Sequence, residues 1–100
     1  MSISGTEVKE AIAQRVTASN EALIVDLADA RTITVPLAWF PRLEHGTPAE
    51  RANWRLIGRG VGIHWSELDE DISVESLLAG RRSGETQASL RRWLRTRKTG

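Results

Sequence analysis

The sequence contains no cysteine, which excludes both a disulfide framework and a thiolate metal site. A small secreted scaffold would lose its usual source of stability, so this absence favours a reducing cytoplasm. Long apolar runs are also missing, since residues 22–25 fall far short of the ~20 residues that cross a bilayer. The N-terminus lacks the basic stretch and apolar run of a secretion signal. We therefore expect a cytoplasmic protein with no membrane partner.

Tyrosine is absent as well, and the aromatic residues are four tryptophans and one phenylalanine. Trp54 and Trp65 lie on apolar faces of their segments and are expected in the core. Trp39 lies beside two prolines, in a segment that cannot bury all of its aromatic surface. Because tryptophan is enriched where interfaces concentrate their energy, Trp39 is the better candidate for an exposed contact.

The chain otherwise has the balance of an ordinary globular domain: 40% of its 100 residues are hydrophobic and 27% are charged, which fits one core. The net charge of +1 conceals an asymmetry. Residues 1–80 carry seven basic and twelve acidic side chains, a net of −5, whereas residues 81–100 carry seven basic and one acidic, a net of +6. We predict a single domain over residues 1–80 and a basic tail over residues 81–100, whose counterpart is nucleic acid, an acidic partner or the domain itself.

Three strands are expected before the first proline. Residues 12–19 alternate imperfectly, whereas residues 23–27 place an apolar side chain at every second position and indicate a half-buried strand. Residues 31–35 repeat the alternation, and the short spacing indicates a hairpin. Alanine at positive φ costs roughly 1 kcal/mol, so Ala30 suits a tight turn less well than glycine, and a longer loop or a bulge is the alternative.

Pro36 and Pro41 limit the next segment to a turn or a short helix. Helical spacing within it directs one of Trp39 and Phe40 toward the core and the other partly outward. A capping box then begins a longer helix, which we expect to end at about Ile57. The box is formed by Thr47, Pro48 and Glu50, the buried edge of this helix by Trp54 and Ile57, and its surface by Arg51 and Arg55.

A fourth strand is expected over residues 61–65, with His64 on the face opposite its apolar side chains. Ser73 caps a last short helix that Gly80 closes. Together these elements predict an α+β fold: a small antiparallel sheet of three to four strands, two to three short helices packed mainly on one face, and a basic, helix-compatible C-terminal tail.

Four segments resemble one protein family closely. They are TVPLAWFPRL at residues 34–43, GRGVGIHW at residues 58–65, LDEDISV at residues 68–74 and LLAG at residues 77–80. Over about residues 10–80 the chain is similar to the uncharacterised bacterial domain-of-unknown-function family numbered 2442. It departs from the family pattern at Ala30, where glycine is expected, and at Ser66, where proline is expected.

The resemblance implies regulation rather than catalysis. Family members are short bacterial proteins, sometimes followed by a helix-turn-helix domain, and some are encoded beside small proteins suspected of forming toxin–antitoxin pairs. No catalytic or ligand-binding residue is established for the family, so none is carried over to this chain. We expect no enzyme activity, no cofactor and no bound metal.

Two motifs have alternative functional interpretations. Gly58, Gly60 and Gly62 form a G-x-G-x-G run that is similar to a phosphate-binding loop. The run follows a predicted helix and opens a strand, the reverse of a dinucleotide fingerprint, so a helix stop and strand entry is the better interpretation. His64 and Ser66 point the same way on a strand, yet side chains two residues apart start about 7 Å from each other, too far for a nucleophile and its base.

The acidic run at residues 69–71, with His64 and His45, has the chemistry of an oxygen-rich metal site, but its spacing matches neither a calcium loop nor a zinc site. The alternative is that these carboxylates accept N–H bonds near the last helix or pair with Arg42 or Arg59. A small metal-dependent or hydrolytic enzyme using these groups is the second class of function.

The preferred function is a noncatalytic interaction or regulatory protein, antitoxin-like, whose partner protein is the product of a neighbouring gene. It would bind through residues 39–42, a sheet edge or the tail, and an exposed edge also suits a symmetric homodimer. Nonspecific nucleic-acid binding is the third class, since the tail arginines and Lys98 would contact phosphates without reading bases. The candidate binding residues are Trp39, Phe40 and Arg42 in the body and Arg91, Arg92 and Arg95 in the tail.

Overall fold

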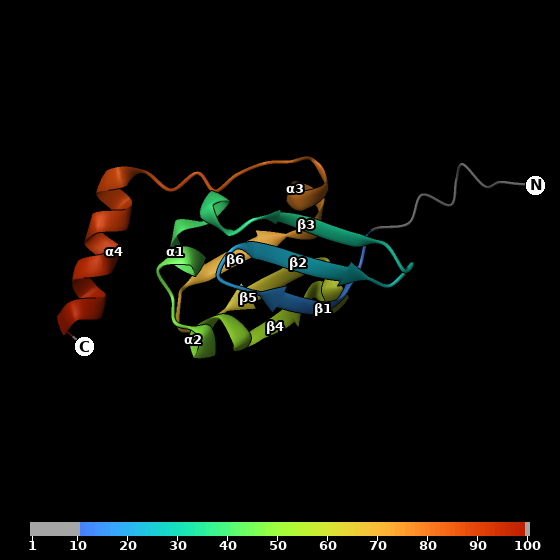
Figure 1. Cartoon of the computed structure of the whole chain (residues 1–100), viewed down its shortest axis with the longest axis horizontal. Helices are drawn as coiled ribbons and strands as arrows, with labels where there is room; N and C mark the ends of the chain where they lie inside the picture. The colour runs from blue at the N-terminus through green and yellow to red at the C-terminus, as the bar shows by residue number, and fades with distance from the viewer. Residues whose placement is uncertain (1–10, 100) are drawn as a thin grey trace, which may run out of the picture.

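The computed structural model describes residues 11–99, with side chains to residue 97, and its first element is a three-stranded antiparallel sheet (Figure 1). The strands are β1 (Ala13–Ala18), β2 (Ala22–Leu27) and β3 (Thr32–Pro36), in that order across the sheet. Alternate side chains of β2 are buried, because one face of the sheet covers the core. The period-two pattern thus predicted this sheet correctly.

The turn between β2 and β3 is short and holds Ala30 in the left-handed region, at φ 77°. The Leu27 N–H donates to the Arg31 carbonyl at 2.8 Å, and the Arg31 N–H donates to the Asp29 carboxylate at 3.1 Å. These bonds hold the turn closed although alanine at positive φ costs roughly 1 kcal/mol. The hairpin prediction is confirmed, and the longer loop is not formed.

The predicted helix to Ile57 is wrong beyond its first turn. The capping box is present, since the Glu50 N–H donates to Thr47 Oγ1 at 3.1 Å and the Thr47 N–H to Glu50 Oε1 at 2.9 Å. However, α2 (Pro48–Ala52) is followed by a strand, β4 (Trp54–Ile57). Its pairing with the next strand packs Trp54 and Leu56 half-buried against the core, which overrides the local helical signal.

A second antiparallel sheet is formed by β4, β5 (Gly62–Trp65) and β6 (Glu70–Ser73), in that order. Strand β6 has no counterpart in the sequence prediction, because its three polar residues leave Ile72 as the sole apolar signal. The α+β class is confirmed, but the single sheet of three to four strands is replaced by two sheets of three strands each.

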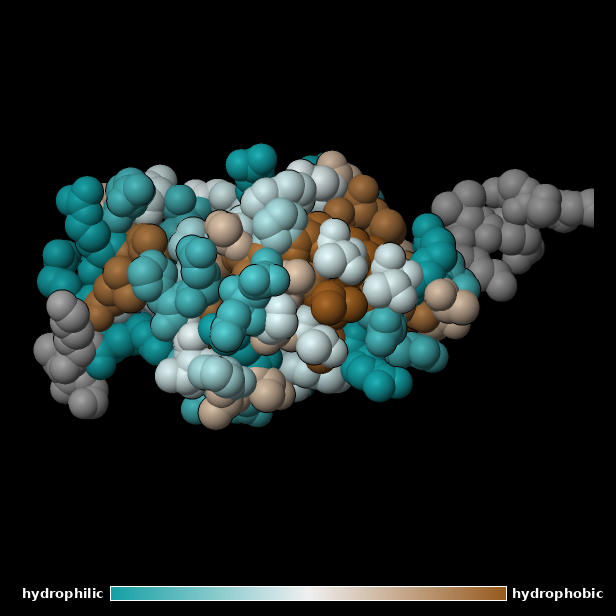
Figure 2. Space-filling view, in the orientation of Figure 1, coloured by the Kyte–Doolittle hydropathy of each residue, from teal (hydrophilic) through white to brown (hydrophobic). Residues whose placement is uncertain are grey.

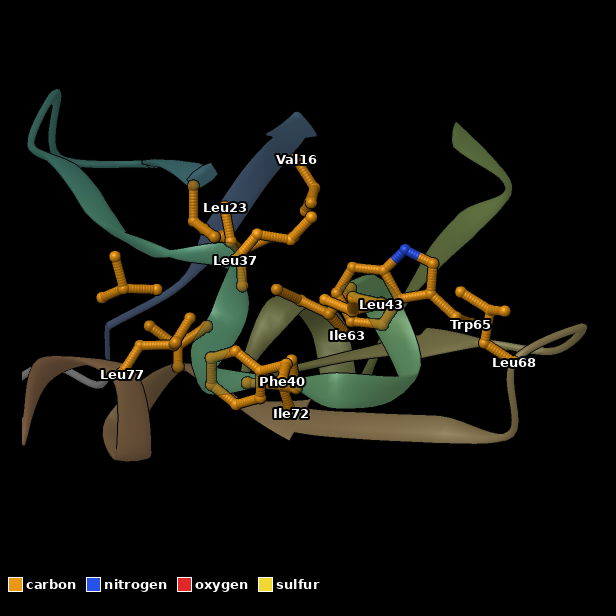
Figure 3. Close-up of a cluster of buried hydrophobic side chains, with 14 of the residues drawn as sticks. Val16, Leu23, Leu37, Phe40, Leu43, Ile63, Trp65, Leu68, Ile72 and Leu77 are labelled. Carbon is orange, nitrogen blue, oxygen red and sulfur yellow. The ribbon is translucent and has the colours of Figure 1, made fainter. Parts of the chain in front are cut away.

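The segment between the sheets fills one end of the core. The 3-10 helix η2 (Leu37–Trp39) and α1 (Pro41–Glu44) bury Leu37, Phe40 and Leu43 among side chains of both sheets (Figure 3). Trp65 is fully buried as predicted, and its indole N–H donates to the Arg51 carbonyl at 3.0 Å. Trp54 was also predicted in the core, but its side chain is only half-buried and packs against the edge of the buried cluster.

Two further positions of the predicted helix also differ. Arg51, expected on the surface, is 4% exposed, and Ile57, expected in the core, is 37% exposed. Arg51 lies in α2 and is buried because its guanidinium donates to oxygen atoms of separate segments. Ile57 lies in a strand rather than a helix, so helical periodicity does not give the direction of its side chain. Arg55 remains on the surface as predicted.

The glycine run is a strand connection, not a helix stop. The 3-10 turn η3 (Gly58–Gly60) joins β4 to β5, and Gly58, Arg59 and Gly60 have φ values of 57°, 61° and 103°. At Gly60 the backbone of the first sheet approaches so closely that an added Cβ would lie 2.8 Å from the Ala13 carbonyl oxygen. The run therefore lets the two sheets meet.

The last helices begin and end largely as the sequence indicates. Ser73 caps α3 (Val74–Leu78) by accepting the Ser76 N–H at 3.0 Å, and Gly80, at φ 73°, ends it with Arg81 N–H donating to the Ser76 carbonyl at 3.0 Å. Residues 81–86 then lead to α4 (Gln87–Thr99), which stands at the α1 and α2 end of the body (Figure 1).

Candidate interaction surface at the C-terminal helix

The segment before α4 is attached to the body at Trp39. The Ser83 N–H donates to the Trp39 carbonyl at 3.0 Å, and the Arg82 guanidinium lies 4.9 Å from the centroid of the Trp39 ring. A cation over an indole face is attracted by the ring quadrupole. The half-buried Trp39, predicted as an exposed contact, is therefore engaged by the chain's own basic segment.

Arg42 is the main attachment point of α4. Its Nε donates to Glu85 Oε1 at 2.6 Å and its Nη2 to Glu85 Oε2 at 3.2 Å, a bidentate pair whose side chains are only 16% and 8% exposed. The Nη1 group donates to the Asp69 carbonyl at 2.9 Å and its carboxylate at 3.3 Å. Bidentate, partly buried pairs are among the stronger ion pairs, because the guanidinium fork matches the carboxylate and little water screens them.

A second ion pair holds the far end of the helix. Arg97 donates through Nη2 to Glu50 Oε1 at 2.7 Å and through Nη1 to Glu50 Oε2 at 3.2 Å. Between the two pairs lies Trp93, whose ring centroid is 5.2 Å from the Arg42 guanidinium carbon and 4.7 Å from that of Arg97. One face of α4 is thus fixed on the acidic body by charge and by stacking.

The electrostatics of this face follow from its ion pairs. The hydrogen bonds from Arg42 hold the pKa of Glu85 below its ordinary value of 4.5, against an opposing effect of burial. The hydrogen bonds from Arg97 lower the pKa of Glu50 in the same way, assisted by the Thr47 N–H. Both carboxylates are therefore ionised more readily in the docked state than in a solvated chain.

Acid is expected to release α4 from the body. A carboxylate with a lowered folded pKa contributes stability that is fully present above its ordinary value, here 4.5, and is lost as the pH falls through the lowered value. The amide-exchange protection factors of α4, which correct for the intrinsic pH dependence of exchange, should therefore fall below pH 4.5 while those of β2 stay high. Glu85→Gln should shift the release toward neutral pH. Retained α4 protection after both carboxylates are protonated would contradict this.

The opposite face of α4 is solvent-exposed. At 3.6 residues per turn, Arg91, Arg92 and Arg95 fall within about 100° of arc, turned away from Trp93 and Arg97. All three are exposed, and the half-buried Leu94 lies at the edge of their arc, about 60° from Arg91. Figure 2 shows hydrophilic atoms gathered over this end of the molecule around a short apolar strip. We call Arg91, Arg92 and Arg95 the outer arginine face; the side chain of Lys98 lies outside the described residues.

Phe40 does not belong to this surface. Its side chain is 4% exposed and points into the core between the two sheets (Figure 3). The helical spacing correctly predicted that one aromatic of the Trp39–Phe40 pair faces inward, but the proposal of Phe40 as a contact residue is wrong. The sequence patterns did not single out Glu85 as a contact residue. It is the sole acidic residue among residues 81–100, and this isolated charge is the signal that could have indicated an ion pair with a basic residue of the body such as Arg42.

The residues considered for a metal or hydrolytic site do not form one cluster in the structure. His64 Nδ1 lies 2.5 Å from Asp71 Oδ1 across the β5–β6 ladder, whereas Asp69 pairs with Arg42 and has φ 51° in the turn before β6. His45 lies at the exposed end of α1. Within the described side chains, no group of three or more His, Asp or Glu is arranged to hold a metal ion.

Fold and contacts together define a small α+β protein of two three-stranded sheets with a salt-bridged C-terminal helix. Residues 13–83 match the profile of the protein family of unknown function DUF2442, and the chain belongs to that family. The match ends before α4. Each helix within residues 11–99 is too short or too polar to cross a lipid bilayer.

Two solved structures are similar to this one. A crystal structure of a protein of unknown function from Rhodospirillum rubrum is 28% identical, with a TM-score of 0.67 over 82% of this chain and 99% of that one. A solution structure of an uncharacterised protein from Chromobacterium violaceum is 22% identical, with a TM-score of 0.64 over 79% of this chain and 72% of that one, and supports the fold alone. No curated protein matches the chain.

Proposed function

We propose that this protein is a noncatalytic interaction module whose outer arginine face binds an acidic surface of a partner protein. The observation that most directly supports this proposal is the orientation of α4. The two bidentate ion pairs fix its inner face on the body, so that three arginines are held outward on one side. A helix fixed in this way loses less conformational freedom on binding than a free tail.

The composition of the outer arginine face favours a protein over another kind of partner. Arginine is enriched at protein interfaces and pairs with carboxylates bidentately. The half-buried Leu94 at the edge of this face adds apolar area, which contact with a phosphate backbone would not use. The specific form of the proposal is antitoxin-like regulation, in which the partner is the product of a neighbouring gene and is held inactive by this contact.

The test is coexpression with the neighbouring gene, followed by gel filtration with light scattering. A stable complex is expected, and simultaneous Arg91→Glu, Arg92→Glu and Arg95→Glu substitutions should abolish it by opposing the partner's charge. A matched control reverses three arginines of the body, Arg15, Arg55 and Arg59, and should leave the complex intact.

Two outcomes would contradict the proposal. Survival of the complex after reversal of the outer arginine face would place the contact elsewhere. Absence of a complex, combined with binding of a labelled oligonucleotide that weakens steeply with added salt, would replace the protein partner with a nucleic-acid backbone.

The His64–Asp71 pair supports a second candidate, a small hydrolase in which Asp71 orients the imidazole as a base. The Asp71 side chain is 68% exposed and that of His64 is 20% exposed, so the pair is in contact with solvent. If this candidate holds, esterase or phosphatase activity on small chromogenic substrates should be lost in His64→Ala and retained after reversal of the outer arginine face.

A further inference from the structure

A small polar cavity of about 230 Å³ lies between β6 and residues 81–84, the segment that leads toward α4. It is smaller than the ~300–1,000 Å³ of sites for drug-sized ligands, so it admits only a small molecule. Phe40 and Ile72 supply its apolar wall, and three serines add hydroxyl groups. Its charged lining residues are Glu70, Asp71, Arg81 and Arg82.

The negative side of the cavity is Glu70. This half-buried carboxylate accepts the Asp71 N–H at 3.0 Å, and burial raises its pKa above the ordinary value of 4.5. Arg42 acts on this carboxylate electrostatically, but the donors of Arg42 are bonded to Glu85 and Asp69. Among the described side chains, none is within ion-pair distance of Glu70, so its charge lacks a matching cation.

The positive side of the cavity is Arg81. Arg82 also lines it, but the Arg82 guanidinium lies over the Trp39 ring. The exposed Arg81 makes no ion pair with any described carboxylate, Glu70 included. Asp71 lines the cavity as well, but its carboxylate oxygen Oδ1 lies 2.5 Å from His64 Nδ1. Of the four charged lining residues, Glu70 and Arg81 are thus the two whose charges have neither an ion-pair partner nor an aromatic ring against them among the described side chains.

We infer that this cavity binds a small zwitterion of the α-amino acid class, with its ammonium group on Glu70 and its carboxylate on Arg81. The serine hydroxyls offer further hydrogen bonds, and Phe40 with Ile72 accommodates a short apolar side chain. A simple anion would face Glu70, and a simple amine would leave Arg81 unmatched. A metal ion would find fewer than three clustered ligands among the described residues.

The inference is tested by titrating the labelled full chain with the common L-amino acids, one at a time, and following amide NMR shifts. At least one amino acid should give saturable shifts confined mainly to residues 70–84. Matched probes that lack one charge, the amide of that amino acid and its deaminated acid, should bind at least tenfold more weakly, because each loses one charge-assisted contact.

Two variants locate the contacts. Glu70→Gln and Arg81→Gln should each weaken binding about tenfold or more, whereas the controls Glu75→Gln and Arg55→Gln should not. Unchanged shifts outside the cavity show that each variant is folded. Failure of every amino acid to give saturable shifts, or equal affinity in Glu70→Gln, would overturn the inference. Reversal of the outer arginine face should leave amino acid binding intact, which separates this result from the proposed function.

Discussion

Replacing Arg51 with methionine is expected to lower the free energy of unfolding by about 4 kcal/mol, since hydrogen bonds to charged donors contribute ~1.5–3 kcal/mol each and several are lost together. The side chain is 4% exposed. Domains of this size are stable by only ~5–15 kcal/mol, so the loss is a large fraction of the total.

The reason is that Arg51 joins separate segments through neutral oxygens. Its guanidinium donates to the Gly46 carbonyl at 2.6 Å, the Leu43 carbonyl at 3.3 Å, the Ala18 carbonyl at 3.4 Å and Asn20 Oδ1 at 2.5 Å. These acceptors belong to the β1–β2 turn and to the end of α1. Methionine fills the space of the stem but leaves buried carbonyls without a donor.

Urea denaturation measures the effect, with the midpoint compared at constant m value. Arg51→Lys should recover only part of the stability, because a single ammonium cannot reach acceptors spread over a planar fork. Arg55→Met is the matched control: the same substitution four residues away, on the exposed side of β4, should change stability little. Equal midpoints for the two methionine variants would show that the Arg51 network contributes nothing.

Replacing Gly60 with alanine is expected to lower the free energy of unfolding by about 3 kcal/mol, the sum of left-handed backbone strain and of overpacking. At φ 103° the residue is in a conformation that side chains rarely adopt. An added Cβ would lie 2.7 Å from Ile12 Cγ2 and 2.8 Å from the Ala13 carbonyl oxygen, and the latter is backbone that cannot turn away. Relief would require the two sheets to move apart.

Two other glycines separate the contributions. Gly80 has φ 73° but no atom within 4 Å of an added Cβ, so Gly80→Ala should show the backbone strain alone, about 1 kcal/mol. Gly84 has open space as well and no positive φ, so Gly84→Ala should be nearly neutral. If Gly60→Ala cost no more than Gly80→Ala in thermal or urea unfolding, close approach of the sheets at Gly60 would be disproved.

The sequence predicted several residues of the candidate interaction surface but not how they contact one another. The charge asymmetry indicated that the tail has an acidic counterpart, and Trp39 and Arg42 were named as contact residues. Sequence patterns could not show that these two observations concern one contact, because Arg42 and Glu85 are 43 positions apart. Only the path of the chain brings them within hydrogen-bonding distance and turns Arg91, Arg92 and Arg95 outward.

The sequence by itself determined the features that depend on neighbouring residues. The Thr47–Glu50 capping box, the Ser73 cap, the Gly80 helix end and the alternation of β2 each follow from contacts within a few positions. The tertiary structure alone decided that residues 54–57 are a strand, that residues 70–73 form its sheet's far edge and that Arg51 is buried. Those outcomes depend on cross-strand pairing and on acceptors distant in the chain, whose free energy exceeds the local propensity that periodicity measures.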